Sequence, residues 1–226
     1  MINKNLILII LSIILLIIIN NKYEFFIVNE NKWLNYRLGD VIKGDRKLAK
    51  NYTGSIAQEY VNLTQNLEKK NNFDILNKII ENRKKNSNIT IPGKNDIVIH
   101  IRLGDTITNF KNNKFNRLRK NWSTDVNLLD NILKELKPKY NKSKVYLVYG
   151  AHKKNINLKA NQKFLDTIES IIKKYNFKFE KINNNPDEDF LFMCNSKIFI
   201  KSGGGFSRII SQIVKQKGGI IYDPKV

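Results

Sequence analysis

The stretch Asp96-Ile97-Val98-Ile99-His100-Ile101-Arg102-Leu103-Gly104-Asp105 decides the fold of this chain. Its first half is an unbroken run of β-branched residues, which is typical of a strand buried in a parallel sheet. Its second half places four polar or small residues where that strand is expected to end. Ligands of open α/β sheets bind at the carboxyl ends of strands, so we expect a site at this turn. The guanidinium of Arg102 can hold two phosphate oxygens, although a local ion pair with Asp105 is the alternative.

The chain after residue 96 alternates regularly between strand and helix patterns. Short apolar runs predict strands at 97–101, 145–149, 177–182, 197–200 and 219–222. Between them, helical spacing of apolar residues predicts helices at 124–136, 162–175, 188–195 and 206–216. Such alternation predicts βαβ units, and therefore an α/β fold with a Rossmann-like parallel sheet and flanking helices. We assign residues 96–226 to this domain.

The first 95 residues divide into two parts. Residues 6–19 are almost purely aliphatic and are followed by no small-residue cleavage site, which favours an uncleaved signal anchor within residues 1–25. A cleaved signal peptide or a buried helix are the alternatives. The anchor predicts a single-pass membrane protein with a lumenal, Golgi-like catalytic domain. Residues 26–95 show helical spacing at 55–69 and 73–83, so a small, mostly helical region should precede the sheet.

The composition bears on the class of partner and on the chemistry of the single cysteine. The formal charge of +20 would suit a nucleic acid partner, but the lysines are scattered and no aromatic residues interleave with a basic stripe. We therefore expect no nucleic acid partner. A local basic run holds Lys111, Lys114, Arg117, Arg119 and Lys120. The single cysteine, Cys194, lies in an apolar helical pattern and is expected to be a buried, inert thiol.

A second motif, Lys201-Ser202-Gly203-Gly204-Gly205-Phe206-Ser207, follows one predicted strand and opens a predicted helix. Glycines there let backbone N–H groups approach an anion at the helix N-terminus, although a simple tight turn would look the same. Right-handed crossovers place the carboxyl ends of all the parallel strands along one edge. The turns at 102–105, 150–152 and 202–207 should therefore converge on one crevice.

The two motifs together resemble the α-1,2-, α-1,6- and protein O-fucosyltransferase superfamily. The resemblance rests on His-x-Arg-x-Gly-Asp at 100–105 and Ser-Gly-Gly-Gly-Phe-Ser at 202–207, with Asp187, Cys194 and Ile198 near the spacing of that family's later block. It covers residues 96–223 and implies the C-terminal nucleotide-sugar domain of a GT-B glycosyltransferase. It also implies GDP-fucose as donor, a glycan or glycoprotein acceptor, an inverting transfer, and neither a metal ion nor another cofactor.

The resemblance also implies roles for individual residues. Arg102 would clamp the diphosphate and stabilise the charge that grows on the departing GDP, and His100 would orient Arg102 or touch the nucleotide. The other expected binding residues are Gly104, Asp105, His152, Ser202, Gly204, Gly205, Phe206 and Ser207. Gly150-Ala151-His152 stands where many relatives carry an aspartate, so His152 would contact the base, and a spectator surface histidine is the alternative.

The sequence departs from the family pattern at several positions. Leu103 stands where many relatives have a second arginine, and Arg208 replaces a usual tryptophan. Residues 26–95 are far shorter than the usual acceptor-binding domain. Only position in the chain suggests a catalytic base, and it gives two candidates, Asp40 and Glu59.

Two other readings of the sequence remain open. Asp187-Glu188-Asp189 has the Asp-x-Asp form of metal-dependent glycosyltransferases, although acidic residues at a helix N-terminus explain it equally well. The chain could instead be a degenerate transferase or a membrane-anchored protein that binds a nucleotide sugar or a polyanion without catalysis.

Overall fold

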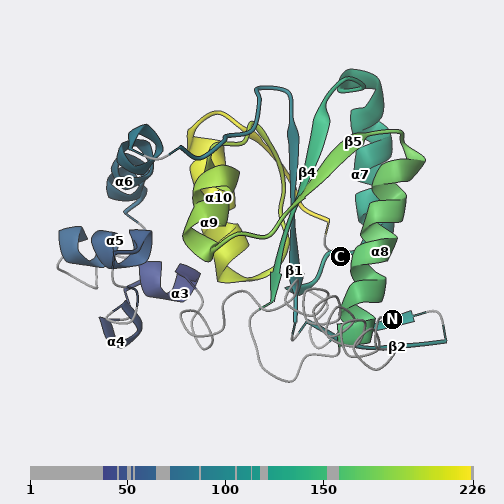
Figure 1. The fold of residues 1–226 in the computed structure, drawn as a ribbon, viewed down its shortest axis with the longest axis horizontal. Helices are drawn as coiled ribbons and strands as arrows, with labels where there is room; N and C mark the ends of the chain where they lie inside the picture. Colours follow the sequence, from purple (N-terminus) through teal and green to yellow (C-terminus); the bar gives the residue numbers. More distant parts are fainter. Residues whose placement is uncertain are drawn as a thin grey trace, which may run out of the picture.

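A computed structural model describes residues 38–44, 46–49, 52, 54–64, 72–86, 88–104, 106–112, 114–117, 122–151 and 158–224. At its centre lies a parallel sheet of five strands in the order β5-β4-β1-β6-β7 (Figure 1). The strands are β1 (Ile97–Leu103), β4 (Lys144–Ala151), β5 (Lys178–Ile182), β6 (Ile198–Ile200) and β7 (Ile220–Tyr222). The predicted Rossmann-like α/β fold is confirmed.

The strand that opens the sequence argument is the middle strand of the sheet. All seven residues of β1 are buried, and β1 pairs in parallel with β4 on one side and β6 on the other. Packing on both faces explains the β-branched run, because such side chains fit a pleated surface well. The strand continues to Leu103, two residues beyond the predicted end, so Arg102 belongs to the strand itself and pairs with Gly150.

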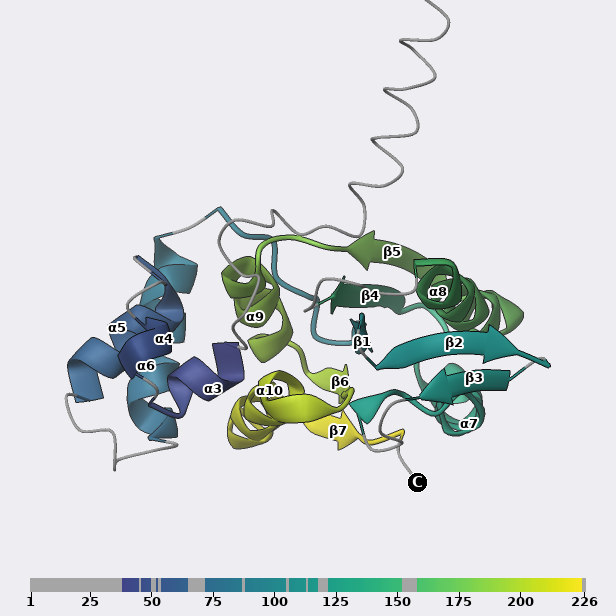
Figure 2. The ribbon, with the colours of Figure 1, turned by 90° about the horizontal axis from the view of Figure 1, so that it is seen from below.

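Two helices cover each face of the sheet (Figures 1 and 2). One face carries α7 (Val126–Lys139) and α8 (Leu158–Lys174), and the other carries α9 (Pro186–Cys194) and α10 (Gly204–Gln216). Asp125 caps α7 by accepting hydrogen bonds from the N–H groups of Asn127 and Leu128, a role that aspartate commonly plays just before a helix. Asn185 caps α9 by accepting from the N–H of Glu188. Cys194 is buried and reduced, as expected.

Four short helices lie beyond α9 and α10, away from the sheet (Figure 1). They are α3 (Leu38–Ile42), α4 (Arg46–Ala49), α5 (Ile56–Thr64) and α6 (Phe73–Lys85). The patterns at 55–69 and 73–83 predicted α5 and α6, while α3 and α4 were too short to show a period. Their apolar side chains join those of α9 and α10 in one hydrophobic core. The helices therefore pack against the sheet domain rather than standing apart from it.

An antiparallel hairpin interrupts the alternation between β1 and α7. It consists of β2 (Ile107–Lys111) and β3 (Lys114–Arg117), and the sequence patterns did not predict it. Phe110 and Phe115 contact each other, and Phe115 also contacts Phe164 of α8. The described part of the basic run, with exposed Lys111 and Lys114, lies on this hairpin. This described part of the run therefore lies on a hairpin that contacts α8 through Phe115 and Phe164.

The predicted signal anchor, residues 1–25, lies outside the described residues. In the described part of the chain, no helix combines the length and the apolar character needed to cross a membrane. The anchor and the domain boundaries remain predictions.

Candidate functional site

Arg102 lies at the carboxyl end of β1 and is almost fully buried. Its side chain and backbone together retain 3% of their accessible surface, and its guanidinium carbon lies 4.7 Å from the centre of the Trp122 ring. A ring face attracts a cation through its quadrupole. The tryptophan thus helps hold a charge that burial would otherwise disfavour.

The two sequence motifs are joined by a chain of buried hydrogen bonds. The backbone N–H of Arg102 donates to the Ser202 hydroxyl (3.1 Å), and the N–H of Ser202 donates to the Ser207 hydroxyl (2.9 Å). The Thr106 hydroxyl donates to the carbonyl of Arg102 (2.9 Å). Both serines are buried. In the structure, the two serine hydroxyls therefore fix the backbone of Arg102 and of the glycine motif.

Gly204 is the point at which the two motifs come closest. Its φ of +90° is a conformation that side chains rarely adopt, and a Cβ built there would lie 2.5 Å from Nη1 of Arg102. A glycine is required at this position for both reasons. The guanidinium therefore reaches the backbone at the start of α10.

The N-terminus of α10 supplies further positive potential. Its N-cap is Gly203, which provides no side-chain hydrogen bond, and the first N–H groups of any helix have no partner within it. The thirteen-residue helix also has its positive dipole end here. A buried guanidinium beside a helix N-terminus is an arrangement that binds phosphate-like anions.

His100 and Phe206 face each other beneath this site. Their ring centres are 5.6 Å apart in an edge-on arrangement, and Phe206 also packs against Phe190 at 5.8 Å. His100 retains 5% and Phe206 9% of their accessible surface. The structure places both as packing residues under the turn, and their contact with a ligand remains a prediction.

Asn161 is the residue that sequence reasoning missed. Its amide lies fully buried on α8, where its oxygen accepts from the N–H of Gly104 (2.7 Å). Its nitrogen donates to the carbonyls of Gly104 (3.3 Å) and Ile107 (3.1 Å). One side chain thus fixes the loop that follows Arg102. An isolated asparagine in an asparagine-rich chain carries no signal of this role, and neither does Trp122.

The other predicted site residues fall into two groups. Gly205 lies in the first turn of α10, next to Gly204. Asp105 and His152 lie outside the described residues, so the local ion pair of Asp105 and the base contact of His152 stay predictions.

Two carboxylates of the Asp187-Glu188-Asp189 triplet accept hydrogen bonds from backbone N–H groups. Asp187 accepts from the N–H of Ile56 (2.7 Å), and Asp189 accepts from the N–H of Asn184 (3.2 Å). Burial raises the pKa of Asp187 to about 6 and that of Asp189 to about 7. Within the described residues, no three metal-ligating side chains of the His, Cys, Asp or Glu type gather around one point. These contacts favour the structural reading of the triplet over the metal-binding one.

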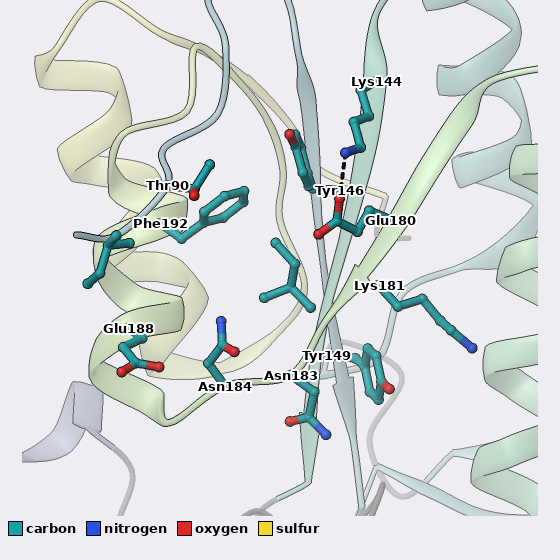
Figure 3. Close-up of a pocket in the computed structure, with 12 residues that line it drawn as sticks. Thr90, Lys144, Tyr146, Tyr149, Glu180, Lys181, Asn183, Asn184, Glu188 and Phe192 are labelled. Atoms are coloured by element: carbon teal, nitrogen blue, oxygen red, sulfur yellow. Dashed lines mark hydrogen bonds and ion pairs between the residues drawn. The ribbon is translucent and has the colours of Figure 1, made fainter.

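A groove of about 1070 Å³ lies elsewhere, between α9 and the strands β4 and β5 (Figure 3). Its wall includes Tyr146 and Phe192, whose ring centres are 5.0 Å apart, and an ion pair of Lys144 with Glu180. Its described lining contains none of the residues that the two motifs predict for the site.

Comparison with known proteins adds little to this geometry. No family model matches the chain, and no curated protein matches it. Among solved structures it is similar to a crystal structure of POFUT1 in complex with GDP-fucose, with 14% identity over 66% of this chain and a TM-score of 0.37. The match covers 47% of that structure's chain. A likeness at this level says nothing about activity.

Proposed function

We propose that the protein is a glycosyltransferase that binds the diphosphate of a nucleotide sugar at the first turn of α10. The observation that carries this proposal is the buried guanidinium of Arg102, held against Gly204 and the Trp122 ring. Burying an arginine at a helix N-terminus is unfavourable unless an anion or a ring compensates the charge. A diphosphate, with its several oxygens, matches both the fork and the backbone N–H groups.

The motif resemblance names the donor as GDP-fucose and the acceptor as a glycan or glycoprotein. In an inverting transfer, an acceptor hydroxyl attacks the anomeric carbon from the face opposite the diphosphate. The bond from that carbon to the phosphate oxygen breaks, GDP leaves with the electron pair, and the hydroxyl proton passes to a base or to water. Arg102 would stabilise the charge that develops on GDP, which is the task a metal ion performs in other transferases.

The two candidates for the base differ in their surroundings. Glu59 is paired with Arg83 of α6 (3.1 Å), so its carboxylate serves the helical region. Asp40 lies beside the first turn of α10, and its Oδ1 is 3.5 Å from where a Cβ of Gly205 would stand. Asp40 therefore borders the diphosphate side of the proposed site and not the opposite face from which the hydroxyl attacks, so we assign neither carboxylate as the base.

The test is calorimetry of the full chain in detergent against GDP, GDP-fucose, UDP-sugars and ADP. Arg102→Lys keeps the charge but loses the fork, and should weaken GDP binding by about tenfold or more. Lys78→Ala, an exposed change on α6, is the matched control. If the chain binds none of these nucleotides, the proposal is wrong. If it binds GDP-fucose but transfers fucose to no glycan, it is a donor-binding protein and not a transferase.

We also propose that residues 1–25 anchor the chain in a membrane with the described domain in the lumen. Carbonate extraction and protease protection of the full chain in microsomes test this directly. Release of the chain by carbonate would contradict the anchor, and digestion of the domain in intact microsomes would contradict its lumenal side.

A further inference from the structure

The short helix α3 contacts the start of α10 through its backbone. A Cβ on Gly39 would lie only 2.7 Å from the carbonyl carbon of Gly205 and 2.7 Å from the nitrogen of Phe206. Only glycine allows this approach. The flanking residues Leu38, Val41 and Ile42 are buried, which fixes the helix in place. The helical region thus reaches the site that the two sequence motifs form.

This contact brings a second cation to the first turn of α10. A Cβ on Gly205 would lie 3.4 Å from the Nζ of Lys43 and 3.5 Å from an Oδ1 of Asp40. On the neighbouring residue, Gly204, the same construction meets Nη1 of Arg102 at 2.5 Å. Two adjacent glycines are therefore bordered by a guanidinium from the sheet and by the ammonium of Lys43, which directly follows α3.

We propose that Lys43 is the second cation of the anion site and binds the diphosphate of the nucleotide together with Arg102. This inference rests on the proposed function. A diphosphate carries more than one negative charge, and a single guanidinium leaves part of it uncompensated. Leu103 stands where many members of the superfamily, though not its protein O-fucosyltransferases, carry a second arginine, and it is an apolar side chain with no accessible surface. Lys43 would supply a second positive charge from a different part of the chain.

Asp40 leads to a second prediction, in which the change in GDP affinity is opposite in sign to that for Lys43. Its carboxylate borders the same glycine as the ammonium of Lys43, so it lowers the positive potential that a diphosphate would meet. Asp40→Asn should therefore tighten the binding of GDP, while Lys43→Ala should weaken it. A purely structural role of α3 would instead make both changes weaken binding together.

The experiment measures binding of inorganic pyrophosphate and of GDP to the full chain at two salt concentrations. Lys43→Ala should weaken both ligands by about tenfold, which corresponds to about 1.4 kcal/mol, and should reduce the dependence of affinity on salt. Lys43→Arg should restore most of the affinity, because it restores the charge. Lys78→Ala on α6 should match the wild type.

The outcomes separate the two proposals. If the wild type binds GDP, Arg102→Lys loses it and Lys43→Ala binds as well as Lys78→Ala, the role of Lys43 is overturned and the proposed function stands. If the wild type binds neither pyrophosphate nor any nucleotide, the proposed function itself is overturned. Lower affinity in Lys43→Ala that Lys43→Arg does not rescue would mean that the side chain acts by packing, which also overturns the role.

Discussion

The groove beside α9 and the first turn of α10 differ in how their charged side chains are arranged. In the groove, Lys144 pairs with Glu180, and its Nζ lies 4.8 Å from the centre of the Tyr146 ring. At α10, Arg102 and Lys43 come from separate elements and border adjacent glycines, with Asp40 as the nearby carboxylate. The groove has volume and an ion pair of its own, whereas at the α10 turn two cations and one carboxylate border the partly buried backbone of Gly204 and Gly205. Volume alone does not locate an anion site.

The largest effect should come from a methyl group at the closest approach. Gly204→Ala places a Cβ 2.5 Å from Arg102 at a φ of +90°, so we expect about 3 kcal/mol of lost stability and no measurable GDP binding. Gly218→Ala is the control, because Gly218 also has a positive φ (+73°) but nothing within 4 Å of its Cβ position. Urea unfolding and calorimetry check both variants. Equal losses in the two would show that the contact with Arg102 is unimportant.

The next effect concerns the loop that follows Arg102. Asn161→Ala leaves three buried backbone groups of Gly104 and Ile107 without their partner, so unfolding should become easier by about 2 kcal/mol. GDP affinity should fall as well, because the loop no longer fixes the end of β1. The exposed neighbour Gln162→Ala is the control. Unchanged GDP affinity in a destabilised Asn161→Ala would separate the loop from the site.

The free energy of unfolding should depend on pH through a residue beside the groove. Burial raises the pKa of Asp189, beside the groove, to about 7, above its value in the unfolded chain. The folded state then holds the proton more tightly, so this residue's contribution to stability is full at about pH 4 and is lost as pH rises through about 7.

Asp189→Asn should therefore flatten the pH dependence of the unfolding free energy between about pH 4 and 7. Asp130 provides a control of opposite sign, because its hydrogen bond with Lys174 lowers its pKa. Asp130→Asn should lower the unfolding free energy above the usual aspartate range, and this loss should disappear as pH falls through the lowered pKa. A pH profile of Asp189→Asn that parallels the wild type contradicts this assignment.

The smallest effect is expected from the groove itself. Lys144→Ala removes an ion pair that is open to solvent, and such pairs contribute little to stability. We expect unchanged thermal unfolding and unchanged GDP affinity, measured by calorimetry beside Lys43→Ala. Loss of GDP binding in Lys144→Ala would move the anion site into the groove and reverse the comparison.

Most of the fold followed from local patterns. The β-branched run at 97–99 and the alternation of strand and helix patterns act through neighbours in the chain, so they show in the sequence. The sequence patterns did not predict the hairpin β2–β3, because its aromatic contacts include one with Phe164 on α8, which is distant in the chain. Phe110 contacts Phe115, and Phe115 contacts Phe164. Helices as short as α3 show no period at all.

The sequence by itself determined the sheet domain and its polar strand ends, and it predicted Arg102 as the central residue of a candidate site. Only the tertiary structure decided which residues surround that guanidinium. Ser202 lies 100 positions away along the chain and Asn161 lies 57 positions from Gly104, and they meet because β6 pairs with β1 and α8 covers the neighbouring face. Lys43 reaches the site only through the packing of Gly39. Periodicity and propensity are local, whereas such contacts depend on the order of strands in the sheet.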